Sequence, residues 1–253
     1  GWGWDDVLPF FRKLESDRDF DGPYHGKDGP IGIRRLFPDI WPGYTKAIMK
    51  AADDAGFTYL EDMNADFEDG YFPITISNID DKRVSANVAY LTMEVRARPN
   101  FDILDRAEVQ QLTFDGTRLT GLRVRRPDGE RTIRAKEVIV SGGATHSPAI
   151  LMRSGIGPAA QLSHLGIDIV ADRAGVGQNL MEHPGVSMAS YMKPGARLPP
   201  GMRRQMIAAM RFSSGVEGCG ENDMFIVPTN KSVWHALGDR IGSPRCDPFQ
   251  QHH

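Results

Sequence analysis

Several features that would indicate a particular class of protein are missing from this 253-residue sequence. It has two cysteines, Cys219 and Cys246, which are too few for a disulfide scaffold or a four-cysteine zinc site. No apolar run approaches the roughly 20 residues of a membrane-spanning helix. The formal net charge of −3 gives no overall basic field for nucleic acid. Gly1 stands where a start methionine would be, which predicts an internal or processed piece of a longer chain.

The remaining composition is that of an ordinary globular protein. Hydrophobic residues make up 40% of the chain and charged residues 25%, which excludes a wholly disordered chain. The length permits one large domain or two small ones and is ample for a core. Because cysteine is scarce and no signal peptide is present, a reducing compartment fits, and we favour the cytoplasm.

Hydrophobic periodicity predicts three helices in the first half of the chain. Asp5–Leu14 and Val84–Met93 are two of them, and Pro42–Ala55 is the clearest. The glycine- and proline-rich residues 22–33 predict a loop that leads into a strand. The face that we expect to be buried in the second helix comprises Tyr44, Ala47, Ile48, Ala51, Ala52 and Ala55.

Residues 101–141 change to a strand pattern. Two Asp-Gly turns, at residues 115–116 and 128–129, predict hairpins, so the segment is typical of an antiparallel meander. Glu137–Ser141 is almost wholly apolar and predicts a buried parallel strand. The other strand candidates are Phe101–Leu104, Val109–Phe114, Leu119–Arg125 and Thr132–Ala135.

A glycine turn follows the apolar strand. Ser147 and Pro148 suit the start of a helix, which runs to Arg153 and is ended by Gly155. A further helix is predicted at 158–165 and a strand at 167–170. A strand followed by glycines and a helix lets a ligand come close to the backbone and offers free N–H groups to an anion or ribose. From the spacing alone, a tight turn that binds no ligand explains these residues equally well.

Other candidate sites are weaker. A G-x-G-x-x-G fingerprint is absent, and its nearest match, Gly175–Leu180, predicts a loop. His146 lies in the glycine turn, whereas His25 and His183 are better read as surface or structural residues. Gly201–Phe212 predicts a basic, methionine-rich amphipathic helix, which would pack on the core, line a substrate entrance or lie on a membrane surface.

Gly143–Gly157 reads G-A-x-x-S-P-x-I-L-x-x-S-G-I-G, which resembles the second signature of the glucose–methanol–choline (GMC) oxidoreductase family. Further segments resemble the family in the same order. The resemblance covers roughly residues 2–185 and extends more weakly to about Gly242. Those segments are Trp4–Lys13, Tyr24–Gly26 with Gly29-Pro30, Arg83–Leu91, Arg98–Asn100 and Gly175–His183.

The resemblance implies an FAD-dependent enzyme that oxidises the CH–OH group of a small-molecule alcohol, similar to alcohol or choline dehydrogenases. The implied fold is mixed α/β, with a Rossmann-like FAD domain, an antiparallel meander and part of a substrate domain. Val109 would place its backbone against the adenine, and Ser141, Gly142 and Gly143 would lie near the adenosine. No metal site, nucleic acid or catalytic residue is implied, and the electron acceptor is not identified.

The resemblance also implies a domain layout. Residues 1–21 would be a helix segment of the FAD domain, 22–80 part of the substrate domain or lid, and 81–182 the FAD-binding part with meander and signature. Residues 183–242 would begin the substrate-binding domain, and 243–253 form an atypical tail. His235 resembles a family segment upstream of the catalytic histidine, which this chain lacks.

Two alternatives stay open at this point. A family member can keep FAD and run other chemistry, as a lyase or photodecarboxylase does. A truncated fragment without catalysis is the second, because the family's pyrophosphate loop would lie before Gly1.

Overall fold

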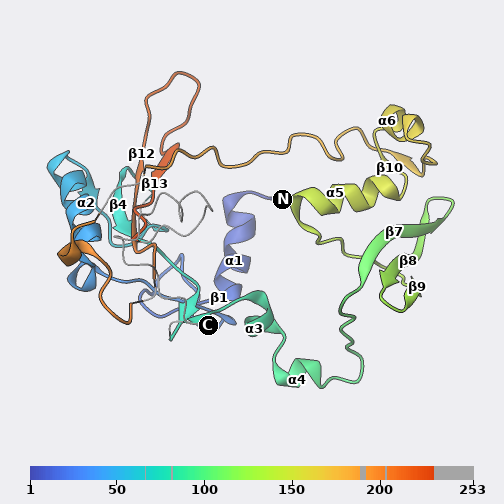
Figure 1. Cartoon of the computed structure of the whole chain (residues 1–253), viewed down its shortest axis with the longest axis horizontal. Helices are drawn as coiled ribbons and strands as arrows, with labels where there is room; N and C mark the ends of the chain where they lie inside the picture. Colours follow the sequence, from blue (N-terminus) through green and yellow to red (C-terminus); the bar gives the residue numbers. More distant parts are fainter. Residues whose placement is uncertain (66, 81, 189–191, 203, 231–253) are drawn as a thin grey trace. The chain divides into compact units, whose positions relative to one another are not determined.

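The computed structural model describes residues 1–65, 67–80, 82–188, 192–202 and 204–230 (Figure 1). His235, Cys246 and the 243–253 tail lie outside these residues. The chain divides into two compact units, which we describe separately: Gly1–Arg98 with Met188 onward, and Pro99–Ser187. Helices and small sheets alternate along the chain, which confirms the expected mixed α/β class. Within the described part, no helix combines the length and the hydropathy needed to cross a bilayer.

The first unit is built around a four-stranded sheet in the order β13-β12-β4-β3. Strand β12 pairs antiparallel with both β4 and β13, and β3 pairs parallel with β4. Ala208 and Ala209 are fully buried in β12, and successive strand residues point to opposite faces, so each joins a different core cluster. The strands are β3 (Thr58–Tyr59), β4 (Gly70–Pro73), β12 (Ala208–Phe212) and β13 (Met224–Ile226).

Helix α2 (Gly43–Asp54) packs on this sheet and ends close to the predicted limits, with Pro42 as its N-cap. The face of this helix that was predicted to be buried is partly wrong, because Ala47, Ala51 and Ala55 are exposed. Alanine fits either face of a helix, so its pattern is a weak guide. The residues that α2 buries are Thr45, Met49 and Ala52.

The predicted helix at Gly201–Phe212 is wrong. Residues 208–212 form β12 instead, and Met206 makes an isolated bridge to Thr229. The methionine spacing suits a helix, but β4 offers a partner whose hydrogen bonds outweigh that preference.

The rest of the first unit is made of short elements. Helix α1 (Trp4–Leu14) confirms the first predicted helix and buries none of its residues. The predicted helix at 84–93 is interrupted, because Ser85 and Thr92 each accept a capping bond and start separate short helices. The elements are β1 (Glu15–Asp17), β2 (Ile31–Ile33), η1 (Pro38–Ile40), β5 (Asn78–Ile79), β6 (Lys82–Arg83), α3 (Ala86–Tyr90), α4 (Met93–Arg96) and η2 (Pro194–Ala196).

A buried ion cluster lies beside the parallel pair β1–β2. The Arg35 guanidinium donates to both carboxylate oxygens of Asp17 at 3.0 and 2.9 Å and to Asp62 Oδ1 at 2.9 Å. Burial raises the pKa of Asp17, but bonds from Arg35 and from the backbone N–H groups of Asp19 and Phe20 outweigh this. The pKa of Asp17 is therefore lowered below 3.8.

This lowered pKa predicts acid sensitivity. In the unfolded chain Asp17 takes up a proton near pH 3.8, and in the folded chain only at lower pH, so its stabilisation is complete above pH 3.8 and falls below it. We expect this part of the free energy of unfolding to be lost as the pH falls from about 3.8 to the lowest pH at which the chain stays folded. Urea unfolding should show a shallower fall for Asp17→Asn than for the exposed control Asp54→Asn. Parallel pH profiles for the two variants would contradict this.

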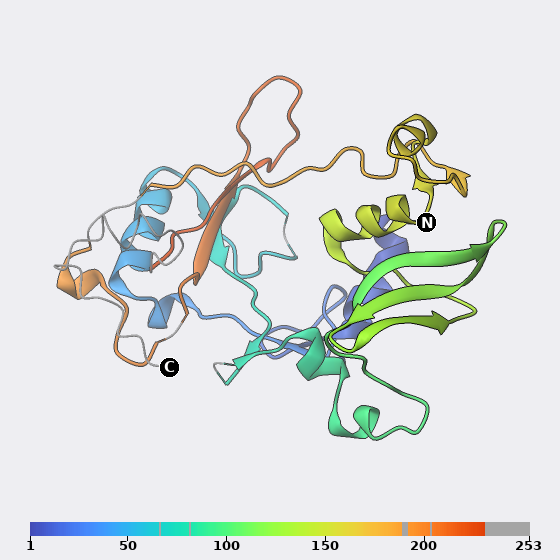
Figure 2. The same ribbon diagram turned by 45° about the vertical axis from the view of Figure 1, so that its right-hand side comes forward.

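The second unit contains the expected antiparallel meander. Its turns place Gly116 at φ +60° and Gly129 at φ +125°, which glycine adopts without strain. The predicted strand at 101–104 is wrong, since those residues pair with no described strand. The meander is drawn in green in Figure 2 and consists of β7 (Glu108–Asp115), β8 (Arg118–Arg126) and β9 (Gly129–Arg134).

The signature helix α5 (Gly143–Arg153) contacts β7 and leads into a small parallel pair. The predicted strand at 167–170 is displaced, because pairing occurs at residues 171–172 instead. Helix α6 confirms the prediction at 158–165. These elements are β10 (Ile156–Gly157), α6 (Ala159–His164) and β11 (Ala171–Asp172).

The predicted buried strand at 137–141 is wrong for this chain. The segment pairs with no described strand, and Ile139 is 83% exposed. An apolar parallel strand is stable only between neighbouring strands. The described residues supply none here.

Candidate cofactor site

Val109 lies near the start of β7, half-buried opposite Val124. The register shifts between Val109 and Gln111, so a bulge follows the residue. Arg153, the last residue of α5, donates to the Gln110 carbonyl at 2.8 Å and to the Val109 carbonyl at 3.2 Å. Bulges redirect the backbone and are common beside ligand sites. The Val109 carbonyl is therefore held in place by the helix.

The glycine turn forms the opposite end of α5. The helix begins at Gly143 with Gly142 as N-cap, so the predicted start at Ser147 is wrong. Pro148 lies inside the helix, where its missing N–H cannot bond to the Ala144 carbonyl. Gly143 has φ +81°, and a Cβ there would meet no atom within 4 Å. Ser141, Gly142 and Gly143 are all exposed, so the free N–H groups of the first helical turn are accessible.

The C-terminal end of α5 is anchored by the serine and glycine of the signature. Ser154 Oγ accepts from the Leu112 N–H at 2.7 Å and donates to the Ile150 carbonyl at 2.6 Å. Gly155 has φ +80°, and a Cβ there would lie 2.3 Å from the Asp168 carbonyl oxygen. The signature therefore fixes the helix against β7 and against the chain before β11.

We expect Ser154→Ala to destabilise the second unit by about 1–3 kcal/mol, because it leaves the buried Leu112 N–H without a partner. Amide hydrogen exchange at Leu112 and urea unfolding would measure the loss. Ser163→Ala, at an exposed position of α6, is the matched control. Equal stability of the two variants would refute the anchoring role.

A mostly apolar pocket of about 630 Å³ runs along α5 from its first turn. The Gly175–Leu180 segment is a loop, as predicted, and forms the other wall. Gly177 has φ +77°, and a Cβ there would lie 3.1 Å from Met152 Sδ, so the loop packs closely on the helix. The lining residues are Ala144, Thr145, Pro148, Ala149, Met152, Gly177, Gln178, Asn179, Leu180 and Met181.

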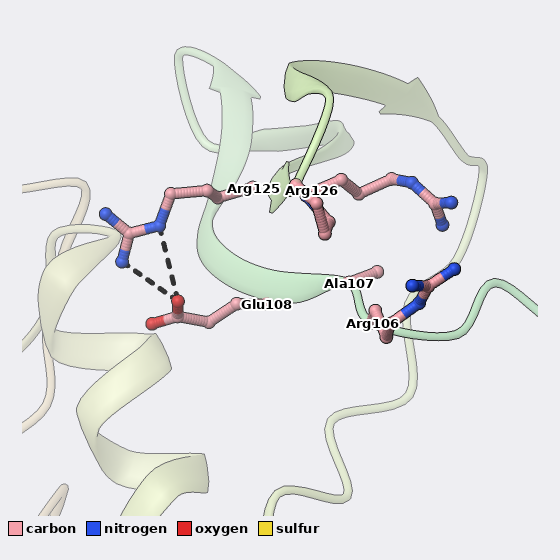
Figure 3. Close-up of a pocket in the computed structure, with 6 residues that line it drawn as sticks. Arg106, Ala107, Glu108, Arg125 and Arg126 are labelled. Carbon is pink, nitrogen blue, oxygen red and sulfur yellow. Dashed lines mark hydrogen bonds and ion pairs between the residues drawn. The ribbon is translucent and has the colours of Figure 1, made fainter.

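A second pocket, of about 570 Å³, lies immediately before Val109 and is lined mainly by charged residues (Figure 3). Arg125 donates to Glu108 at 2.9 Å, and bonds from Arg125 and Gln110 hold the pKa of Glu108 below its ordinary value. In Figure 3, the side chains of Arg106 and Arg126 lie on the side of Ala107 opposite to Glu108 and Arg125.

All four predicted site residues, Val109, Ser141, Gly142 and Gly143, belong to the second unit. Helix α5 is tied to β7 at its last residue and opens at the glycine turn, and its eleven residues span about 16 Å between these ends. That these four residues contact one shared ligand stays a prediction. His146 and His183 are exposed, whereas His25 is buried in the ion cluster.

Two residues that matter for this geometry were not predicted as site residues. Arg153 and Ser154 tether α5 to β7, across more than 40 residues of sequence. Ser154 is a constrained position of the signature, and this is the sequence signal that could have identified it. Its partner, a backbone N–H of β7, has no signal in the side-chain pattern.

The profile of the GMC oxidoreductase family matches residues 1–185, which include the meander, the glycine turn and the anchored helix. The chain belongs to this family. A curated GMC relative, 5-(hydroxymethyl)furfural oxidase of Methylovorus sp. strain MP688, is 41% identical over 232 residues, covering 89% of this chain. The chain spans 43% of the length of that relative.

Solved structures agree with this membership. Pyridoxine 4-oxidase from Mesorbium loti aligns with a TM-score of 0.63 at 35% identity, over 68% of this chain and 33% of that one. An FAD-dependent oxidoreductase from Chaetomium thermophilum aligns with a TM-score of 0.59 at 27% identity, over 68% and 32%. FAD as the cofactor of this family is thus confirmed.

Proposed function

We propose that this chain is part of an FAD-dependent oxidoreductase that removes a hydride from the CH–OH group of a small alcohol. The family match over residues 1–185 carries the proposal. The relatives named as oxidases of 5-(hydroxymethyl)furfural and pyridoxine support it. A lyase or other flavin reaction has no such support.

The residues of the second unit fit the adenosine end of FAD. The open space at Gly143 lets an adenine or ribose approach the backbone, and the exposed Ser141 hydroxyl can hydrogen-bond to it. The bulge after Val109 presents strand backbone beside a pocket. When bound, FAD would accept the hydride. These residues of the chain would bind and orient its adenosine, and we assign them no proton or hydride step.

A chimera tests the proposal. The segment of the Methylovorus oxidase that matches this chain is replaced by the corresponding residues of this chain, and the purified protein is examined for flavin absorbance and alcohol oxidation. We expect a yellow protein that oxidises at least one alcohol. A folded chimera without flavin would contradict the cofactor assignment, and one with flavin but no alcohol oxidation would contradict the reaction.

In the same chimera, Val109→Asp should weaken FAD binding at least tenfold, because an unpaired carboxylate would be desolvated against the adenine. Fluorescence titration of the apoprotein with FAD measures the change. Thr117→Asp places the same charge at the exposed far end of the hairpin and is the control. Equal FAD affinity for both variants would remove Val109 from the site.

A further inference from the structure

We propose that Glu15, Asp17 and His25 form a binding site for one divalent cation, Zn²⁺ or Mn²⁺, in the first unit. His25 Nδ1 lies 3.0 Å from Asp17 Oδ2 and 3.3 Å from Glu15 Oε1. The three ligand atoms lie within 4.8 Å of one another. The site is closed, since the side chains of His25, Asp17 and Glu15 are 4%, 0% and 15% exposed.

The surroundings of the imidazole ring point to a ligand. His25 Nε2 lies 2.6 Å from Asp62 Oδ2, and a carboxylate can only accept, so Nε2 carries the proton. On the other side of the ring, His25 Nδ1 is buried beside the carboxylate oxygens of Asp17 and Glu15 and makes no aligned hydrogen bond. Two carboxylates that face one ring nitrogen at this distance repel each other unless a positive charge lies between them.

The distances suit a metal ion. Zn²⁺ binds imidazole nitrogen and carboxylate oxygen at about 2.0–2.2 Å, which places neighbouring ligand atoms about 3.0–3.5 Å apart. One nitrogen with two carboxylates favours Zn²⁺ or Mn²⁺ over Ca²⁺ and Mg²⁺, which prefer all-oxygen sites. The bond from His25 to Asp62 is the carboxylate–histidine arrangement that fixes the tautomer of metal-binding histidines.

Surrounding groups hold the ligands in place. The Gly26 N–H donates to Glu15 Oε1 at 2.9 Å, and Arg35 orients Asp17 and Asp62. Gly26 cannot be replaced, since a Cβ there would lie 1.7 Å from the Arg12 carbonyl oxygen. The tripeptide Tyr24–Gly26 of the family resemblance therefore positions a ligand and its support.

The charge balance also favours a cation. Four carboxylates gather here, those of Glu15, Asp17, Asp19 and Asp62. The Arg35 guanidinium contacts the last three, and Glu15 lies beside His25. Arg12 and Lys27 lie nearby but donate to the main-chain carbonyls of His25 and Asp17, and Lys27 pairs with Asp21.

Metal titration of the chain tests the site. The protein is made without an affinity tag, in a background with His252→Gln and His253→Gln so that the terminal pair binds no metal. After treatment with EDTA, ZnCl₂ or MnCl₂ alone is added, and bound metal and thermal unfolding are measured. We expect one equivalent of one metal to bind and to raise the unfolding temperature.

Three variants locate the site. Glu15→Gln keeps the bond from Gly26 but removes the charge and should lower the affinity at least tenfold. Asp62→Asn should lower it by about 10–100-fold. Asp21→Asn, an exposed acid nearby, should leave it unchanged. The wild-type titration decides the question even if a variant fails to fold.

Two results would overturn the proposal. One is the absence of stoichiometric binding and of any thermal shift with either metal. The other is a metal-free protein in which ¹⁵N NMR shows both His25 ring nitrogens protonated while added metal displaces neither proton. The positive charge between the carboxylates would then be that of an imidazolium.

Discussion

Replacing Arg35 with methionine should destabilise the first unit by about 3–5 kcal/mol, because Asp17 and Asp62 would stay buried without their cation. The Arg35 side chain is fully buried and bonds both carboxylates. Its guanidinium also lies 4.5 Å from the centre of the Phe20 ring, so that contact is lost as well.

Urea unfolding at pH 7 measures the change, followed by a probe in the first unit such as Trp41 fluorescence. Lys50→Met removes an exposed lysine paired with Asp54 and is the matched control, which should unfold at the wild-type midpoint. If Arg35→Met unfolds at the same urea concentration as Lys50→Met, the cluster does not hold this unit together.

The chain expressed alone should purify without stoichiometric FAD and should oxidise no alcohol. Most of a dinucleotide's affinity comes from its pyrophosphate at a glycine loop and helix N-terminus, and this sequence has no G-x-G-x-x-G. The residues that we propose for FAD binding would contact its adenosine end only. The exposed Ile139 should also make the chain poorly soluble.

The test is purification without added flavin, followed by a visible spectrum and a dye-reduction assay with an alcohol. A colourless, inactive protein is expected. A yellow protein with one FAD per chain would show that the glycine turn at Gly142 and Gly143 provides far more of the affinity than its geometry indicates.

Local signals predicted part of the fold. The meander followed from two Asp-Gly turns, and the end of α5 followed from Gly155, because both depend on residues adjacent in sequence. The segments at 137–141 and 201–212 were predicted wrongly because their structure depends on whether a distant strand is present as a partner.

The candidate sites divide in the same way. The glycine turn was found from the sequence, although the helix starts at Gly143 rather than near Ser147. The acidic partners of His25 were not found, because Asp17 and Asp62 come from separate segments and meet only in the fold. A histidine in a glycine loop gives no sign of which carboxylates surround it.

The pairing of β4 with β12 has a consequence for the order of folding. Arg211 pairs with Gly70, and the whole second unit lies between them in sequence. During synthesis, β4 therefore has no β12 beside it until residue 208 has left the ribosome, whereas the hairpins of the meander close within a few residues of each turn. High contact order makes such long-range pairing slow, so closing the first unit's sheet is the late step. Until then, the edge of β4 that later pairs with β12 can pair with another chain. Phe72 of β4, which is fully buried in the folded protein, stays exposed during this time.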